Sequence, residues 1–287
     1  MKFIQFSALL TVVAIFSACT PEEPTPEAGT FTLFFDNRIG EEEITLRAEG
    51  STEYDYVTAS GQAFNLSTFR YYLGKIILTG PDGAYFEDEI VVNAEGTQGY
   101  YLVNEAETNT STIILEGVPA GNYDAIQFII GIDEEGIEQG AAGGILDPAA
   151  GAWFWNWNAG YIGLGMEGSA AESGQQYVDW GGGIETLEGT FAYHIGGWKD
   201  VADNENFVNN IKTVNLEMGT TIEVEKALAP SAHVVVDALR LLDGISVDFA
   251  ETFSVHSPRA GMDMADGIAD MFMVHHVHQS AAGDSHD

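Results

Sequence analysis

The stretch FRYYLGKIILTGPDG, residues 69–83, joins a run of aromatic and β-branched side chains to a turn. Its first ten residues have the composition of a β-strand, and TGPDG after them carries the Pro and Gly that tight turns need. The same order of strand and turn recurs along the chain, with VPAGNY (118–123) and LDPAAG (146–151) as further turns. By this criterion we predict strands at 31–35, 44–47, 69–78, 100–103, 112–115, 123–130, 191–195, 213–217, 221–225 and 233–236.

Helical spacing of hydrophobic residues is scarce, and its clearest instance is residues 260–272. Many short strands, 33 glycines and one late helix predict an all-β fold. We expect an antiparallel β-sandwich, Greek-key-like, with long glycine-rich insertions and a short C-terminal helix. Residues 131–190 are the longest such insertion, and their aromatic content argues for function rather than disorder.

The N-terminus predicts export. Lys2, the short apolar run 6–16 and two small residues before Cys19 are typical of a secretory signal. Phe16-Ser17-Ala18-Cys19 resembles a lipobox, in which the cysteine is lipidated and becomes the mature N-terminus; an ordinary cleaved signal peptide is the alternative. We therefore expect a signal peptide at 1–18, a Pro/Glu-rich tether at 19–29, one β domain at 30–280 and a disordered tail at 281–287.

The formal net charge of −34 excludes nucleic acid as a partner, because such a chain repels phosphate backbones. The acidic residues are spread along the chain, which favours a solubilising surface over a field that concentrates cations. Sequence motifs for a nucleophile elbow, a P-loop or a dinucleotide fold are missing. Nothing singles out a pair of carboxylates for a hydrolase either.

GAWFWNWNAGYIGLGMEG, residues 151–168, holds three of the five tryptophans. In a strand Trp153, Trp155 and Trp157 would share one face, with the residues between them on the other. Such a stripe is compatible with core packing, with a platform on which sugars stack, or with the wall of a metal or redox site. Spacing alone leaves all three open.

Seven histidines all lie after residue 193, four of them in the last 13 residues. His194 and His256 each sit opposite aromatic or aliphatic strand neighbours and so face away from them. In MFMVHHVH, an extended chain would put His276 and His278 on one side, whereas a helix would pair His275 with His278. Imidazole suits copper, zinc, nickel and iron, but no HExxH or CxxC spacing narrows the choice. His233 begins an apolar strand and is interpreted as structural.

Several segments, taken in their order along the chain, resemble the sequences of one protein family. They are FRYYLGKIIL (69–78), VPAGNYDAIQFIIGID (118–133), GGILDPAAGAWFWNWNAGYIGLGMEG (143–168), FAYHIGG (191–197) and VHSPRAGMDMADGIADMF (255–272). Together they look like the MbnP-like family of copper-binding bacterial lipoproteins. The resemblance implies a periplasmic or outer-membrane copper protein rather than an enzyme. In relatives a partner, a di-haem peroxidase-like protein, oxidises a tryptophan to kynurenine, and histidines hold copper beside it.

Carried onto this chain, the resemblance implies that the oxidised residue is Trp153, Trp155 or Trp157, and we choose Trp155. It implies His194 and His256 as copper ligands, with His275 or His276 as a third. The alternative function is a carbohydrate- or surface-binding β-sandwich module that uses the tryptophan stripe as a stacking platform.

Overall fold

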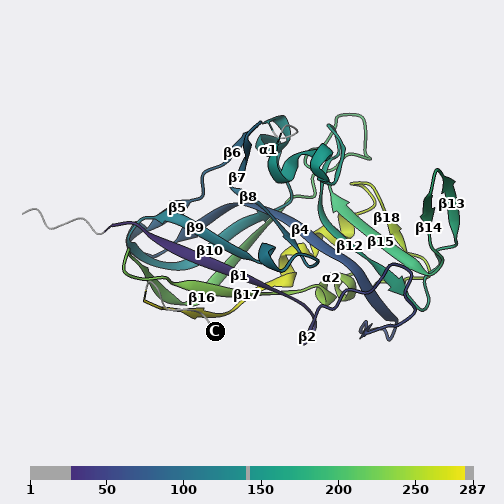
Figure 1. Ribbon diagram of the computed structural model, residues 1–287, viewed down its shortest axis with the longest axis horizontal. Helices are drawn as coiled ribbons and strands as arrows, with labels where there is room; N and C mark the ends of the chain where they lie inside the picture. Colours follow the sequence, from purple (N-terminus) through teal and green to yellow (C-terminus); the bar gives the residue numbers. More distant parts are fainter. Residues whose placement is uncertain (1–26, 140–142, 282–287) are drawn as a thin grey trace, which may run out of the picture.

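The computed structural model describes residues 27–139 and 143–281, and two β-sheets packed face to face make up most of it (Figure 1). The predicted signal peptide, Cys19 and residues 282–287 of the predicted tail lie outside the described residues. The prediction of a mostly β fold with short helices is confirmed.

The smaller sheet has five strands. Its order is β19 (Phe272–His278), β17 (Ser231–Asp237) and β1 (Gly29–Ile39), and β1 then pairs with both β9 (Thr112–Val118) and β2 (Glu42–Glu43). β1 and β17 run parallel, whereas the other pairs are antiparallel. The sheet is therefore mixed rather than purely antiparallel as the sequence predicted.

The larger sheet has ten strands. Its main order is β16 (Lys212–Val224), β10 (Gly121–Ile130), β4 (Ala63–Thr79), β12 (Gly160–Ala170), β15 (Thr190–Gly196) and β18 (Ser254–Val255). β3 (Tyr56–Val57), β5 (Tyr85–Glu87) and β8 (Tyr100–Asn104) also pair with β4, and β11 (Phe154–Asn156) pairs with β12. β15 and β18 are the parallel neighbours in this sheet.

Smaller elements complete the described fold. Two hairpins are formed by β6 (Val91–Asn93) with β7 (Gly96–Gln98) and by β13 (Val178–Gly181) with β14 (Ile184–Thr186). The α-helices are α1 (Glu134–Gln139), α2 (Leu239–Gly244) and α3 (Met262–Asp266). Short 3₁₀ turns are η1 (Pro81–Gly83), η2 (Thr108–Thr110), η3 (Gly144–Leu146), η4 (Pro148–Ala150) and η5 (Ile268–Met271).

The main core lies between the two sheets and follows from alternation along the strands. In β1 every second side chain is buried, and Phe35 meets Tyr71 of β4 and Phe128 of β10 at ring-centroid distances of 6.3 and 6.0 Å. Phe272, at the start of β19, lies 5.3 Å from Phe128. These edge-to-face pairs join the first, middle and last strands of the chain, so burial of their rings fixes how the sheets pack.

A second cluster lies on the outer face of the larger sheet, beneath residues 131–139 and 143–160. The hydroxyl of Tyr72 donates to the carbonyl of Ile145 at 3.1 Å, and that of Tyr161 donates to the carbonyl of Leu146 at 2.6 Å. Leu146 is fully buried there. These contacts hold the segment that leads into the tryptophan-rich stretch against β4 and β12.

The structure corrects several boundaries. Residues 213–217 and 221–225 belong almost wholly to one strand, β16, which runs through the exposed Gly219 at φ +72°. β12 was missed inside the predicted insertion 131–190, although it is a central strand. β19 was missed as well. The helix predicted at 260–272 is confirmed as α3 followed by η5.

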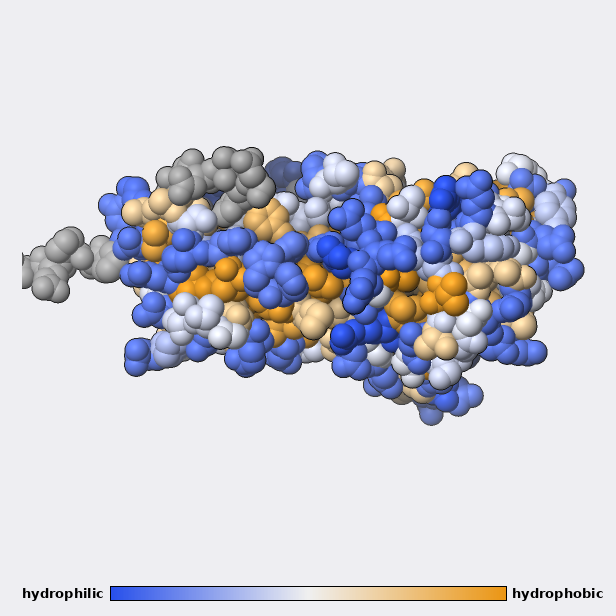
Figure 2. Space-filling view, turned by 90° about the horizontal axis from the view of Figure 1, so that it is seen from below, coloured by the Kyte–Doolittle hydropathy of each residue, from blue (hydrophilic) through white to orange (hydrophobic). Residues whose placement is uncertain are grey.

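Seen from below, hydrophobic residues form a band along the long axis of the molecule, with hydrophilic residues on both sides (Figure 2). In the five-stranded sheet, Ile114 of β9 and Met273 of β19 are exposed hydrophobic side chains. Within the described ranges, no helix is long and apolar enough to cross a membrane.

Candidate metal centre

A polar site is built on the outer face of the larger sheet, across β4, β12 and β15. Arg70, Gly165 and His194 are register partners in a row across these three strands. Leu164, Met166, Tyr193 and Ile195, their chain neighbours, are buried in the core on the opposite face. The prediction that His194 faces away from its aromatic neighbours is therefore confirmed.

The indole of Trp153 lies over the middle of this row. Its ring is 4.9 Å from the His194 ring, and the Arg70 guanidinium carbon is 4.5 Å from its centroid. Gly165 makes this possible, because a Cβ there would lie 3.2 Å from Cε3 and 3.3 Å from Cη2 of Trp153, and closer still to Cζ3. Trp153 is thus held between a cation and an imidazole.

Glu167 anchors His194. Its Oε1 lies 2.6 Å from His194 Nε2, and its Oε2 accepts a hydrogen bond of 3.0 Å from the Thr68 hydroxyl. Burial acts to raise the pKa of Glu167, but the hydrogen bonds from His194 and Thr68 and the nearby imidazoles outweigh it and lower the pKa. The carboxylate therefore stays ionised and fixes the orientation of the ring.

His256 reaches the same site because β18 pairs with β15 in parallel, Tyr193 opposite Val255. Its ring centroid lies 4.4 Å from that of His194, and its Nδ1 lies 3.0 Å from the Ser254 hydroxyl. Desolvation and the neighbouring His194 lower the pKa of His256, which keeps the ring neutral at neutral pH. With one nitrogen of each ring hydrogen-bonded, Nδ1 of His194 and Nε2 of His256 are the nitrogens that can ligate a metal.

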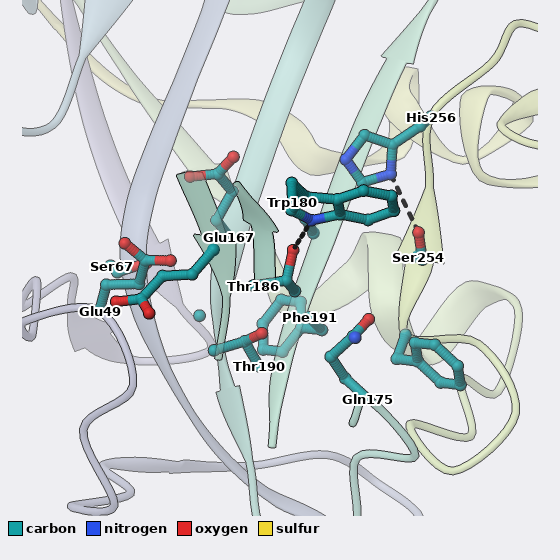
Figure 3. Close-up of a pocket in the computed structure, with 14 residues that line it drawn as sticks. Glu49, Ser67, Glu167, Gln175, Trp180, Thr186, Thr190, Phe191, Ser254 and His256 are labelled. Carbon is teal, nitrogen blue, oxygen red and sulfur yellow. Dashed lines mark hydrogen bonds between the residues drawn. The ribbon is translucent and has the colours of Figure 1, made fainter. Parts of the chain in front are cut away.

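A cavity of about 680 Å³ adjoins this site (Figure 3). Glu167 and His256 lie at one end of it in the view shown, and Gln175 and Thr190 lie at the other. Trp180 of β13 also lines it, with its indole N–H donating to the Thr186 hydroxyl at 3.0 Å. The cavity is large enough for a small molecule to reach the imidazole of His256.

A second group of histidines lies on the outer face of the five-stranded sheet. Single ligand atoms of His233, His275 and His276 lie within 4.8 Å of one another, so this group could hold a metal ion. His233 is opposite His276 in the β17–β19 pair, and a β-bulge inserts His275 beside them. The interpretation of His233 as structural missed this placement, because a bulge leaves no mark in the sequence pattern.

The four predicted ligands therefore fall into two groups in different sheets. His194 and His256 lie together, whereas His275 and His276 lie with His233. The expectation that His275 or His276 completes a site with the first pair does not match this arrangement, because β19 pairs with β17 and not with any strand of the larger sheet. Assignment of any of these residues to copper stays a prediction.

The three tryptophans do not form one stripe, because β11 ends at Asn156 and its pairing with β12 is irregular. Trp153 is half-buried against His194, whereas Trp157 is 57% exposed and packs on Phe154, the residue expected on the opposite face, at 5.2 Å. The continuous stacking platform needed by a carbohydrate module is therefore missing from residues 153–157. The contact with His194 belongs to Trp153 and not to the preferred Trp155.

Sequence reasoning also missed Glu167 and Arg70. Both alternate with core residues, Glu167 after Met166 and Arg70 between Phe69 and Tyr71. The alternation around Arg70 is visible in FRYY, residues 69–72. Around Glu167, the glycines at 160, 163, 165 and 168 make β12 resemble a loop in the sequence.

Comparison with known proteins agrees with this fold. A family model described as MbnP matches residues 28–257. The solved structure of MbnP from Methylosinus trichosporium aligns over 90% of this chain and 100% of that chain, with 16% identity and a TM-score of 0.50, a likeness that concerns the fold alone. A putative cell adhesion protein from Bacteroides eggerthii DSM 20697 aligns over 91% and 98% of the two chains, but its TM-score of 0.17, at 9% identity, carries no weight. A search of curated proteins found no match.

Proposed function

This chain belongs to the MbnP family, and from that premise we propose that it is an exported copper-binding protein rather than an enzyme. The observation that supports this most is the pairing of His194 with His256, 4.4 Å apart, beside the indole of Trp153. Two histidines next to a tryptophan are what the family resemblance implies for copper.

The residues present fit such a metal. Two imidazoles and a polarisable indole form a donor set suited to Cu(I), which prefers soft or borderline ligands to carboxylates. Copper bound there would be either the cargo that the protein carries or its redox centre. The chain's own residues do the positioning: Glu167 holds Nε2 of His194 and Ser254 holds Nδ1 of His256.

Arg70 bears on which tryptophan a partner oxidises. Its guanidinium lies over the face of Trp153, and a cation in that position makes loss of an electron from the ring harder. This contact weighs against oxidation of Trp153 but does not distinguish Trp155 from Trp157, and we keep Trp155, the choice made from the sequence, as the residue converted to kynurenine. The partner we propose is a di-haem peroxidase-like protein, as the resemblance implies.

For location we propose an outer-membrane lipoprotein, anchored through Cys19 and facing the periplasm or the cell surface. Residues 19–29 would then act as the tether between the lipid and the β domain. Acquisition, storage and delivery of copper are all compatible with such an anchored binding protein.

The proposal is tested by producing the mature chain without a histidine tag, in a host that contains the native partner. Copper per chain and intact mass are measured for the wild type and for His194→Asn/His256→Asn. We expect copper in the wild type, its loss from the His194/His256 site in the variant, and a mass change on one tryptophan-containing peptide. A variant that keeps as much copper per chain as the wild type would refute the site, and a wild-type protein with neither copper nor an altered tryptophan would refute the whole proposal.

A further inference from the structure

The outer face of the five-stranded sheet carries a histidine group that the proposed copper site does not use. His233 lies on β17 between the buried Ala232 and Val234 and therefore points outward. His276 is its register partner on β19, and their ring centroids are 4.7 Å apart. Two neighbouring strands thus place one imidazole each at the same point of the surface.

A β-bulge adds the third imidazole. His233 pairs with His276 and Val234 pairs with Val274, so His275 is the extra residue. Val274 and Val277 both pack against the core, which leaves the two residues between them facing outward. Without the bulge, strict alternation would send either His275 or His276 to the core.

The three imidazoles are close enough to share one ion. Nδ1 of His275 lies 2.6 Å from Nδ1 of His276, and ligand atoms of all three residues lie within 4.8 Å of one another. At a metal–nitrogen distance of about 2.0–2.1 Å, ligand nitrogens of one tetrahedral ion are about 3.4 Å apart. Ring rotations that shift these nitrogens by about 1 Å would bring them to the spacing of tetrahedral ligands.

One carboxylate and one guanidinium lie beside this group. The Asp36 Oδ2 on β1 lies 3.6 Å from Nε2 of His233, where it can orient that ring, and it also accepts a hydrogen bond of 2.8 Å from Nε of Arg38.

From this geometry we infer that His233, His275 and His276 form a second metal site, exposed at the surface, that binds Cu²⁺ and, more weakly, Zn²⁺. Three imidazoles suit both ions, and for a given nitrogen site the affinity for Cu²⁺ exceeds that for Zn²⁺. The site is separate from His194 and His256, which lie on the other sheet, and it does not depend on the proposed function.

The test uses the mature, untagged chain, loaded with Cu²⁺ or Zn²⁺ and then desalted. Metal per chain is measured by mass spectrometry, and the Cu²⁺ signal is examined by electron paramagnetic resonance for coupling to nitrogen. Wild type and His194→Asn/His256→Asn should both keep the surface Cu²⁺ with nitrogen coupling. His275→Asn/His276→Asn should lose it, with a fall in affinity of at least about 10-fold.

Met273→Leu is the matched control, because Met273 is exposed on the same strand but contributes no imidazole. It should bind Cu²⁺ like the wild type. If the double variant fails to fold by circular dichroism, His233→Asn on the neighbouring strand replaces it. A folded variant that keeps all its Cu²⁺, or a wild type that holds Zn²⁺ more tightly than Cu²⁺, would overturn the inference.

Discussion

Replacing Gly165 with alanine should displace Trp153 and weaken the site while leaving the fold intact. The new Cβ would lie 3.2 and 3.3 Å from two indole carbons and closer still to a third, whereas carbons at rest are about 3.5–4.0 Å apart. The indole must therefore withdraw by about 1 Å or more from its place between Arg70 and His194. Overpacking of this kind costs about 1–3 kcal/mol of the free energy of unfolding.

Urea denaturation followed by circular dichroism measures this cost, and a double-mutant cycle with Trp153→Ala assigns it. In the Trp153→Ala background the alanine at 165 meets no indole, so Gly165→Ala should cost little there. Gly96→Ala is the control, because Gly96 also lies in a strand and a Cβ there meets nothing within 4 Å. In the copper-loaded protein, Gly165→Ala should also lower copper affinity, since Trp153 no longer packs on His194.

The reasoning is refuted if Gly165→Ala is as costly without the indole as with it. The loss would then come from the strand backbone and not from contact with Trp153. An unchanged free energy of unfolding in the single variant would refute it equally, because it would mean that the indole yields without loss.

Three further predictions concern separate features. Glu167→Gln removes the charge that holds His194, and copper affinity measured by chelator competition should fall by about 10–100-fold. Burial raises the pKa of Glu105 above 4.5, so the folded protein binds that proton more tightly than the unfolded chain does. The free energy of unfolding should therefore decline as the pH rises above 4.5. Glu105→Gln, whose side-chain oxygen can still accept the hydrogen bond from Asn37, should remove that decline in urea titrations from pH 5 to 7. Leu146→Ala empties a fully buried position and should cost about 2–5 kcal/mol, with faster hydrogen exchange at residues 143–160 as its local sign.

Local pattern accounts for much of the fold. β4, β10 and β15 were predictable because aromatic and β-branched residues alternate between turn signals, and that alternation also gave the outward face of His194. β12 was not, since its glycines at 160, 163, 165 and 168 read as a loop. Of these glycines, the structure explains Gly165, because the indole of Trp153 occupies the space above the strand at that position. A glycine that the site requires thus made β12 resemble a loop in the sequence.

The candidate site was only half predictable for a related reason. The facing of His194 and His256 follows from alternation, but which histidines meet depends on strand order, and strand order is set by long-range pairing. The parallel pairing of β15 with β18 brings His256 to His194. The pairing of β17 with β19, together with one bulge, brings His275 and His276 to His233 instead. Neither pairing leaves a signature within a window of a few residues.

The two histidine groups differ in how far their rings are fixed before a metal arrives. His194 and His256 each have one nitrogen bonded to a side chain of the surrounding sheet, so binding there requires little reorganisation. In the surface group the ring of His276 lies against those of His233, His275 and His278, and its Nδ1 is 2.6 Å from Nδ1 of His275, so these two rings must separate to share an ion. If both proposals hold, the surface group should therefore exchange metal quickly, and the group beside Trp153 should hold copper more tightly and more selectively. In a chain with a net charge of −34, metal cations are attracted to both groups, so this difference must come from the local geometry and not from the overall field.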